Sequence, residues 1–144
     1  MKGPRYVTHM KRLAGVEKPL ANFFASGVLA LGKKLGPILW QVPASTEFDE
    51  ETVKHFLSRL PRCSSEAARV ALHHDKRLTG RSLTVADADR PLRHCLEVRH
   101  ESFRAFHVYE LLRAQNIVRL HGAEELYTSG YDAAGIEHWQ EWVL

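Results

Sequence analysis

Residues 37–43 read PILWQVP, which places four apolar residues and one glutamine between two prolines. A short apolar run bounded by proline is typical of a buried β-strand. Residues 95–99 (CLEVR) and 117–121 (IVRLH) repeat this pattern, each with charged residues inside the run. We therefore expect three strands, the last of which ends at Gly122.

The segments between these strands have the apolar spacing of amphipathic helices. The best-defined helix begins near Asp49, a good N-cap, and ends before Pro61. Strands that alternate with helices predict an α/β fold with a parallel sheet. The other predicted elements are helices over 19–31, over 64–74 with Ser64 or Ser65 as cap, over 105–115 and over 132–144, and a loop over 75–94 with a short strand at 83–85.

The composition is that of a single globular domain. The 144 residues are 44% apolar and 26% charged, which excludes disorder, a coiled coil, a collagen-like sequence and a disulfide scaffold. The net charge of +3 is smaller than a dedicated nucleic-acid binder usually shows. The basic residues near the N-terminus can form either a phosphate-facing patch or a solvated turn; they are Lys2, Arg5, His9, Lys11 and Arg12.

The two cysteines, Cys63 and Cys95, are 32 residues apart and form no CxxC pair. This spacing excludes a zinc ribbon and a thioredoxin-type site. Two lone thiols, no signal-peptide pattern and no apolar stretch long enough to span a bilayer predict a cytoplasmic protein without a membrane partner.

Polar residues recur inside the predicted strands. Side chains alternate across a strand, so Glu97 shares a face with Arg99, and Arg119 shares a face with His121. Because a buried charge is costly unless it is paired, these residues predict one shared polar interior together with Gln41. In an α/β barrel such an interior lies at the carboxyl ends of the strands.

Two interpretations of this interior stay open. As a ligand site, it would use Arg99 and Arg119 to bind a phosphate or carboxylate. Glu97 would then be a general base, and His100 or His121 a proton donor or metal ligand. As a structural network, Glu97 would pair with one of the arginines and fill a barrel centre.

Other combinations of residues give weaker signals. Adjacent histidines on a helix point about 100° apart, so His73 and His74 beside Asp75 rarely bind one ion. Ser129 lacks the glycine pattern of a nucleophile elbow. No metal site is predicted from these patterns, and the cofactor stays unknown.

Four segments resemble one known family. Residues 4–13 resemble its PR-x-x-TH-x-x-RL segment, and residues 35–43 its LGP-x-LWQ-x-P strand. Residues 97–103 resemble its E-x-RH-x-S-W/F strand end, and residues 119–122 its RLHG segment, which two tyrosines follow. The chain is thus similar to the YecE-like family, also called domain of unknown function 72. The resemblance implies a TIM-barrel-like fold and no established biochemical activity.

The chain also departs from the family pattern. The strands that precede the PR-x-x-TH segment in family members are absent, and residues 116–119 resemble a junction between two distant family segments. We therefore expect residues 1–144 to form a single partial domain, about half of an eight-stranded barrel, from a truncated and internally deleted copy.

Three functions follow from the resemblance and its gaps. The first is a truncated copy without independent activity. The second is an enzyme or binding protein for an anionic small molecule or a nucleic-acid end, in which Lys2 at the rim and Gln41 support the residues named above. The third is an interaction module that completes its sheet with a partner chain or self-associates through exposed strand edges.

Overall fold

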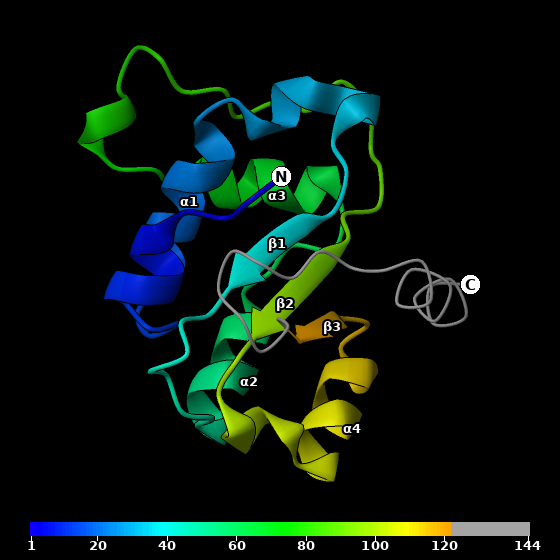
Figure 1. Ribbon diagram of the computed structural model, residues 1–144. Coiled ribbons are helices and arrows are strands. Elements are labelled where there is room, and N and C mark those ends of the chain that lie inside the picture. The colour runs from blue at the N-terminus through cyan, green and yellow to red at the C-terminus, as the bar shows by residue number, and fades with distance from the viewer. Residues whose placement is uncertain (122–144) are drawn as a thin grey trace, which may run out of the picture.

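The computed structural model describes residues 1–121, and the predicted helix over 132–144 and Ser129 lie outside them. In this part of the chain three parallel strands form one sheet in the order β1-β2-β3, which confirms the predicted α/β class (Figure 1). The architecture is an open parallel sheet with helices, consistent with part of a β/α barrel. The strands are β1 (Ile38–Gln41), β2 (His94–Val98) and β3 (Val118–His121).

The N-terminus extends the sheet beyond β1. The amide of Leu39 donates to the Met1 carbonyl, and the amide of Gly3 donates to the Leu39 carbonyl, both at 2.8 Å. These bonds form a parallel bridge between Lys2 and Leu39. This single bridge lies outside the named strands and fixes Lys2 beside the sheet.

Helical segments precede β1 and lie in both connections between the strands. Asp49 caps α2 by accepting a hydrogen bond from the amide of Thr52, which confirms the predicted helix start. Within residues 1–121 the α-helices are α1 (Glu17–Ala25), α2 (Glu50–Ser58), α3 (Ser64–Ala71) and α4 (Phe106–Ala114). The short helical segments are η1 (Tyr6–Met10), η2 (Val28–Lys34), η3 (Lys76–Leu78) and η4 (Glu101–Arg104).

Three local predictions are wrong. The helix expected over 19–31 breaks at Gly27, whose φ of +104° lies outside the helical region. No strand forms at 83–85, because the amide of Leu83 donates to the carbonyl of Ala25 at the end of α1. Cys63 takes the N-cap position of α3, while the Ser64 hydroxyl donates to the carbonyls of residues 88 and 90, in the loop that leads to β2.

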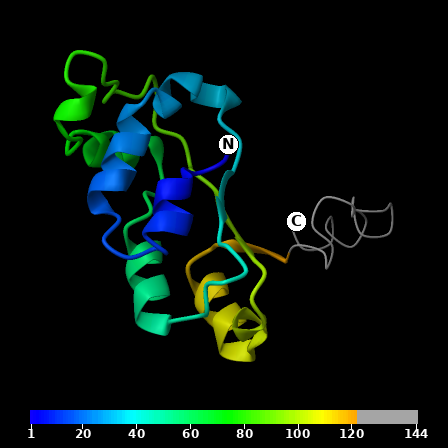
Figure 2. The ribbon, with the colours of Figure 1, turned by 60° about the vertical axis from the view of Figure 1, so that its left-hand side comes forward.

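One face of the sheet is buried under helices. Figure 2 shows α1, α2 and α3 on the same side of β1 and β2. Trp40 is fully buried on this face, with its ring 5.3 Å from that of Phe56 and 5.6 Å from that of Phe23. Beside it, His94 accepts a hydrogen bond from Trp40 Nε1 at Nδ1 (3.1 Å), and its Nε2 bonds to the Pro61 carbonyl (2.8 Å). This face is the hydrophobic core.

The opposite face of the sheet carries side chains of mixed character. Alternation along the strands places Leu39, Gln41, Cys95 and Glu97 there, and all four are only partly buried. No helix within residues 1–121 covers them in the way that the three helices cover Trp40 (Figure 2). We refer to this surface as the open face.

Candidate functional site

A chain of hydrogen bonds crosses the open face at the carboxyl ends of β1 and β2. Lys2 Nζ donates to Gln41 Oε1 (2.6 Å), and Gln41 Nε2 donates to Glu97 Oε1 (2.8 Å). The sheet dictates this contact, because Gln41 and Glu97 are register partners in neighbouring strands. The bridge at Leu39 brings Lys2 within reach of both.

Arg99 completes this chain from the residue after the end of β2. Its Nε and one Nη atom donate to Glu97 Oε1 at 3.2 and 3.0 Å. The Glu97 side chain is 13% exposed and the Arg99 side chain 29% exposed, so the ion pair is partly shielded from water. We call these four residues, Lys2, Gln41, Glu97 and Arg99, the strand-end cluster.

The strand-end cluster has an excess of positive charge. Its two cations flank one carboxylate, and a single oxygen of Glu97 accepts the bonds from both Gln41 and Arg99. Lys2 is exposed and gives one of its three ammonium protons to Gln41. Both cations therefore keep donor groups for an anion that approaches the open face.

The structure does not bring Arg119 together with this cluster. Arg119 pairs by register with Leu96, a buried residue of the face opposite to Glu97. Its guanidinium donates to the Phe103 carbonyl (2.7 Å) and to the Tyr109 hydroxyl, and it lies 3.9 Å from the centre of the Tyr109 ring. Burial lowers the pKa of Arg119 from its usual value. The expected interior therefore divides between the two faces of the sheet.

The two predicted histidines come from different segments: His121 from β3, and His100 from the turn after β2. His121 pairs by register with Val98, one position beyond the partner of Glu97. His100 follows the end of β2 and caps η4 by accepting a hydrogen bond at Nδ1 from the amide of Ser102 (3.2 Å). Within residues 1–121, the hydrogen bonds of the His100 ring go to Ser102 and not to Glu97.

A relay of hydrogen bonds fixes the tautomer of His100. The amide of Phe48 donates to Ser102 Oγ (2.8 Å), and Ser102 Oγ lies 2.8 Å from His100 Nδ1. Because this nitrogen also accepts from the Ser102 amide, it has no proton of its own in this arrangement, and the neutral ring holds its proton on Nε2. The histidine and serine of the E-x-RH-x-S motif thus join the end of β2 to the loop before α2.

Two classes of site have no support within residues 1–121. No group of three or more His, Cys, Asp or Glu side chains in this part of the chain could hold a metal ion. No helix in the same range is long and apolar enough to cross a membrane.

The sequence reasoning did not find a second feature, a groove on the helical side. The groove lies between the N-terminal segment, α1 and η3, and has a volume of about 590 Å³. Its lining combines basic residues of the N-terminal segment and α1 with residues that follow α3, which are about 60 positions apart in the chain. The sequence signals available were the basic stretch near the N-terminus and the His73-His74-Asp75 run, neither of which indicates that they meet. We call this feature the α1–η3 groove; its lining includes Pro4, Lys11, Lys18, Pro19, Phe23, Asp75, Arg77 and Leu78.

The fold and the strand-end cluster define an α/β protein that gathers polar side chains at the carboxyl ends of parallel strands, the usual position of a ligand site in this class. The sequence matches the model of the family described as Protein of unknown function DUF72 over residues 1–117, and the chain belongs to this family. This confirms the family suspected from the sequence motifs, for which no biochemical function is established. No curated protein and no solved structure matches the chain.

Proposed function

We propose that the chain binds a small phosphate-bearing anion at the strand-end cluster. The observation that supports this function is the continuous bonding from Lys2 through Gln41 and Glu97 to Arg99, which positions two cations on one surface. An arginine fork and a lysine ammonium suit phosphate oxygens by geometry and by charge. Glu97 would orient Arg99, and Gln41 would orient Lys2.

The alternative, a purely structural ion pair, predicts a different chemistry. The ion pair of Glu97 and Arg99 is complete without Lys2, so a purely structural pair does not account for the second cation that bonds to Gln41. The excess of one cation over the carboxylates favours an anion over a neutral ligand. We assign no reaction to this site, since the geometry supports binding.

The experiment is a calorimetric titration of the chain with inorganic phosphate and with methyl phosphate, neither of which has an aromatic body. We expect saturable binding to the parent chain and a loss of at least tenfold in affinity in Arg99→Ala and in Lys2→Ala. Arg93→Ala is the matched control, because Arg93 is exposed and directly precedes the other end of β2. Equal affinity in the parent chain and Arg99→Ala would refute the proposal, as would equal losses in all three variants.

We further propose that the open sheet is a section of a TIM-type barrel in a shortened copy of the family domain, and that the chain is cytoplasmic. Within residues 1–121 no helix covers the open face and β3 ends the strand order; these features and the free thiols of Cys63 and Cys95 support this view. Such edges also allow self-association.

Urea unfolding with size-exclusion chromatography tests the fold: a cooperative transition of a monomer would argue against a requirement for a partner chain. Cell fractionation tests the location, and recovery in the membrane fraction would contradict it.

A further inference from the structure

The α1–η3 groove has the size and lining of a small-molecule site. Ligand pockets usually enclose about 300–1,000 Å³ and are lined mainly by apolar groups with a few polar ones. The groove, at about 590 Å³, lies in this range. Its apolar walls come from two prolines, the half-buried ring of Phe23 and the side chain of Leu78. These walls offer flat surfaces to an apolar or aromatic body.

Three cations line the same groove. Lys11 lies over the ring of Tyr6, with Nζ 5.9 Å from the ring centre. Lys18, on α1, donates one hydrogen bond from Nζ to the His73 carbonyl (2.8 Å), which leaves two ammonium protons for other acceptors. The side chain of Arg77 is 80% exposed. All three therefore present charge to solvent at the groove.

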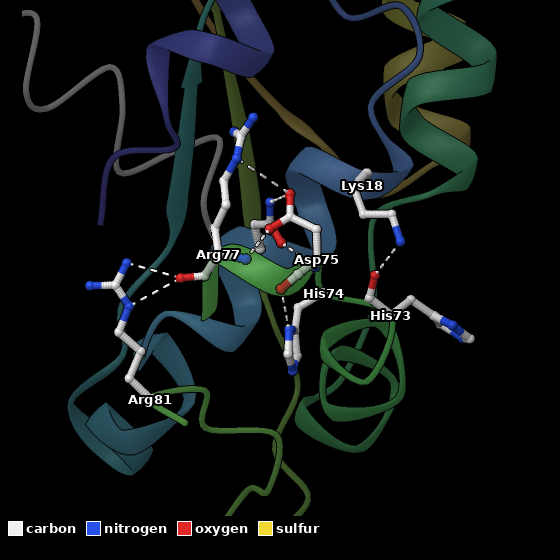
Figure 3. Close-up of polar contacts among 7 residues, drawn as sticks. Lys18, His73, His74, Asp75, Arg77 and Arg81 are labelled. Carbon is white, nitrogen blue, oxygen red and sulfur yellow. Dashed lines mark hydrogen bonds and ion pairs between the residues drawn. The ribbon is translucent and has the colours of Figure 1, made fainter. Parts of the chain in front are cut away.

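The one carboxylate of the lining, Asp75, is already occupied. Its Oδ2 accepts from Asn22 Nδ2 and its Oδ1 from the Arg77 amide, both at 2.9 Å, and Arg77 Nε lies 3.9 Å from Oδ2. The Asn22 bond, the Arg77 amide and the nearby cations lower the pKa of Asp75. Figure 3 shows Asp75 beside Arg77, while Arg81 donates to the Arg77 carbonyl with Nε and Nη2 at 3.2 and 3.0 Å. Asp75 therefore joins η3 to α1 through these hydrogen bonds. The groove keeps an excess of positive charge.

We propose that the α1–η3 groove binds an amphipathic organic phosphate, in which an apolar or aromatic body carries one phosphomonoester group. The body would lie on the proline, Phe23 and Leu78 surfaces. The groove has three cations and one carboxylate, a net charge of about +2. A phosphate, with a charge of about −1.5 to −2 at pH 7, matches this excess. This site is separate from the strand-end cluster, since it is formed by helical segments and not by the open face.

The test uses three probes that divide the ligand into its parts. They are 1-naphthyl phosphate, the neutral 1-naphthalenemethanol and inorganic phosphate, each titrated by calorimetry. We expect 1-naphthyl phosphate to bind at least tenfold more tightly than either of the others, because each of those lacks one half of the contacts. Equal binding of the neutral alcohol and the phosphate would overturn the charge assignment, and equal binding of inorganic phosphate would overturn the role of the apolar walls.

Variants locate the site. The double variant Lys11→Ala/Arg77→Ala removes two exposed cations and keeps the Arg77 backbone amide that bonds to Asp75, so the fold should persist, as circular dichroism would check. We expect it to lose at least tenfold in affinity for 1-naphthyl phosphate, while Lys33→Ala, on η2 and outside the groove, keeps the parent affinity. Unchanged binding in the double variant would refute the proposal. Arg99→Ala separates the two sites: it should keep this affinity, and a loss there would assign the binding to the strand-end cluster.

Discussion

Replacement of His94 tests whether a buried histidine joins the sheet to the helices. Its ring accepts from Trp40 Nε1 and bonds to the Pro61 carbonyl, and the residue is only 2% exposed. His94→Leu would leave both groups buried without partners, at a cost of about 1–3 kcal/mol each. His94→Gln keeps an acceptor and a donor on one side chain. We therefore expect His94→Leu to lose about 2–6 kcal/mol of unfolding free energy and His94→Gln clearly less.

The same histidine makes stability depend on pH. Burial is the main cause that lowers the pKa of His94 below its usual 6.5, and the charge of Arg62 adds to it, against the opposing effect of the Pro61 bond. The unfolded chain therefore takes up this proton at a higher pH than the folded chain does. As the pH falls below about 6.5, the unfolded state binds more protons, and the free energy of unfolding falls by at most about 1.4 kcal/mol per pH unit.

Urea unfolding followed by circular dichroism at pH 7.5, 6.5 and 5.5 measures both effects. Because the two chains differ only at position 94, the difference between them isolates His94. We expect the parent chain to lose more stability than His94→Gln between pH 7.5 and 5.5. A constant difference across this range would refute a neutral, buried His94. Equal destabilisation by His94→Leu and His94→Gln would refute the two hydrogen bonds.

Three further changes test other parts of the fold. A Cβ at Gly3 would lie 2.4 Å from the Trp40 ring, so Gly3→Ala should cost about 1–3 kcal/mol in urea unfolding; parent-like stability would contradict this packing. Asp49→Ala removes the cap of α2 and should cost about 1 kcal/mol, and no change in the unfolding midpoint would count against the cap. Burial raises the pKa of the Cys95 thiol, so at pH 8 it should react with a thiol reagent more slowly than Cys63 does, and equal rates of the two would disagree with that burial.

The positions of the strands could be predicted from the sequence because a buried strand has a local apolar pattern. Four apolar residues between prolines identify β1. The two apolar runs that contain charged residues identify β2 and β3 to within one residue. The same local information failed at 19–31, where the apolar spacing continues through Gly27 but the backbone does not. It also failed at 83–85, where a contact with the end of α1 decides the conformation of Leu83.

The candidate site was predictable only as far as one strand determines it. The pair Glu97 and Arg99 follows from alternation within β2, and the structure joins these residues. Whether Arg119 lies on their face depends on the register of β3 against β2, which no pattern in either strand specifies. A shift of one residue would have exchanged Arg119 with Leu120. The α1–η3 groove was still harder to predict from the sequence, because it depends on tertiary contacts between segments far apart in the chain.

The sheet separates the apolar core from the strand-end cluster by placing them on its two faces. Trp40 and Gln41 are neighbours in β1, yet Trp40 lies in the core, and Gln41 bonds to Lys2 and Glu97 on the open face. Truncation of Trp40 should therefore act mainly on unfolding, whereas truncation of Gln41 should act mainly on the position of the cations. This separation explains how strands with polar residues at alternate positions remain stable. The covered face supplies the apolar burial, and the open face is left to hold charge.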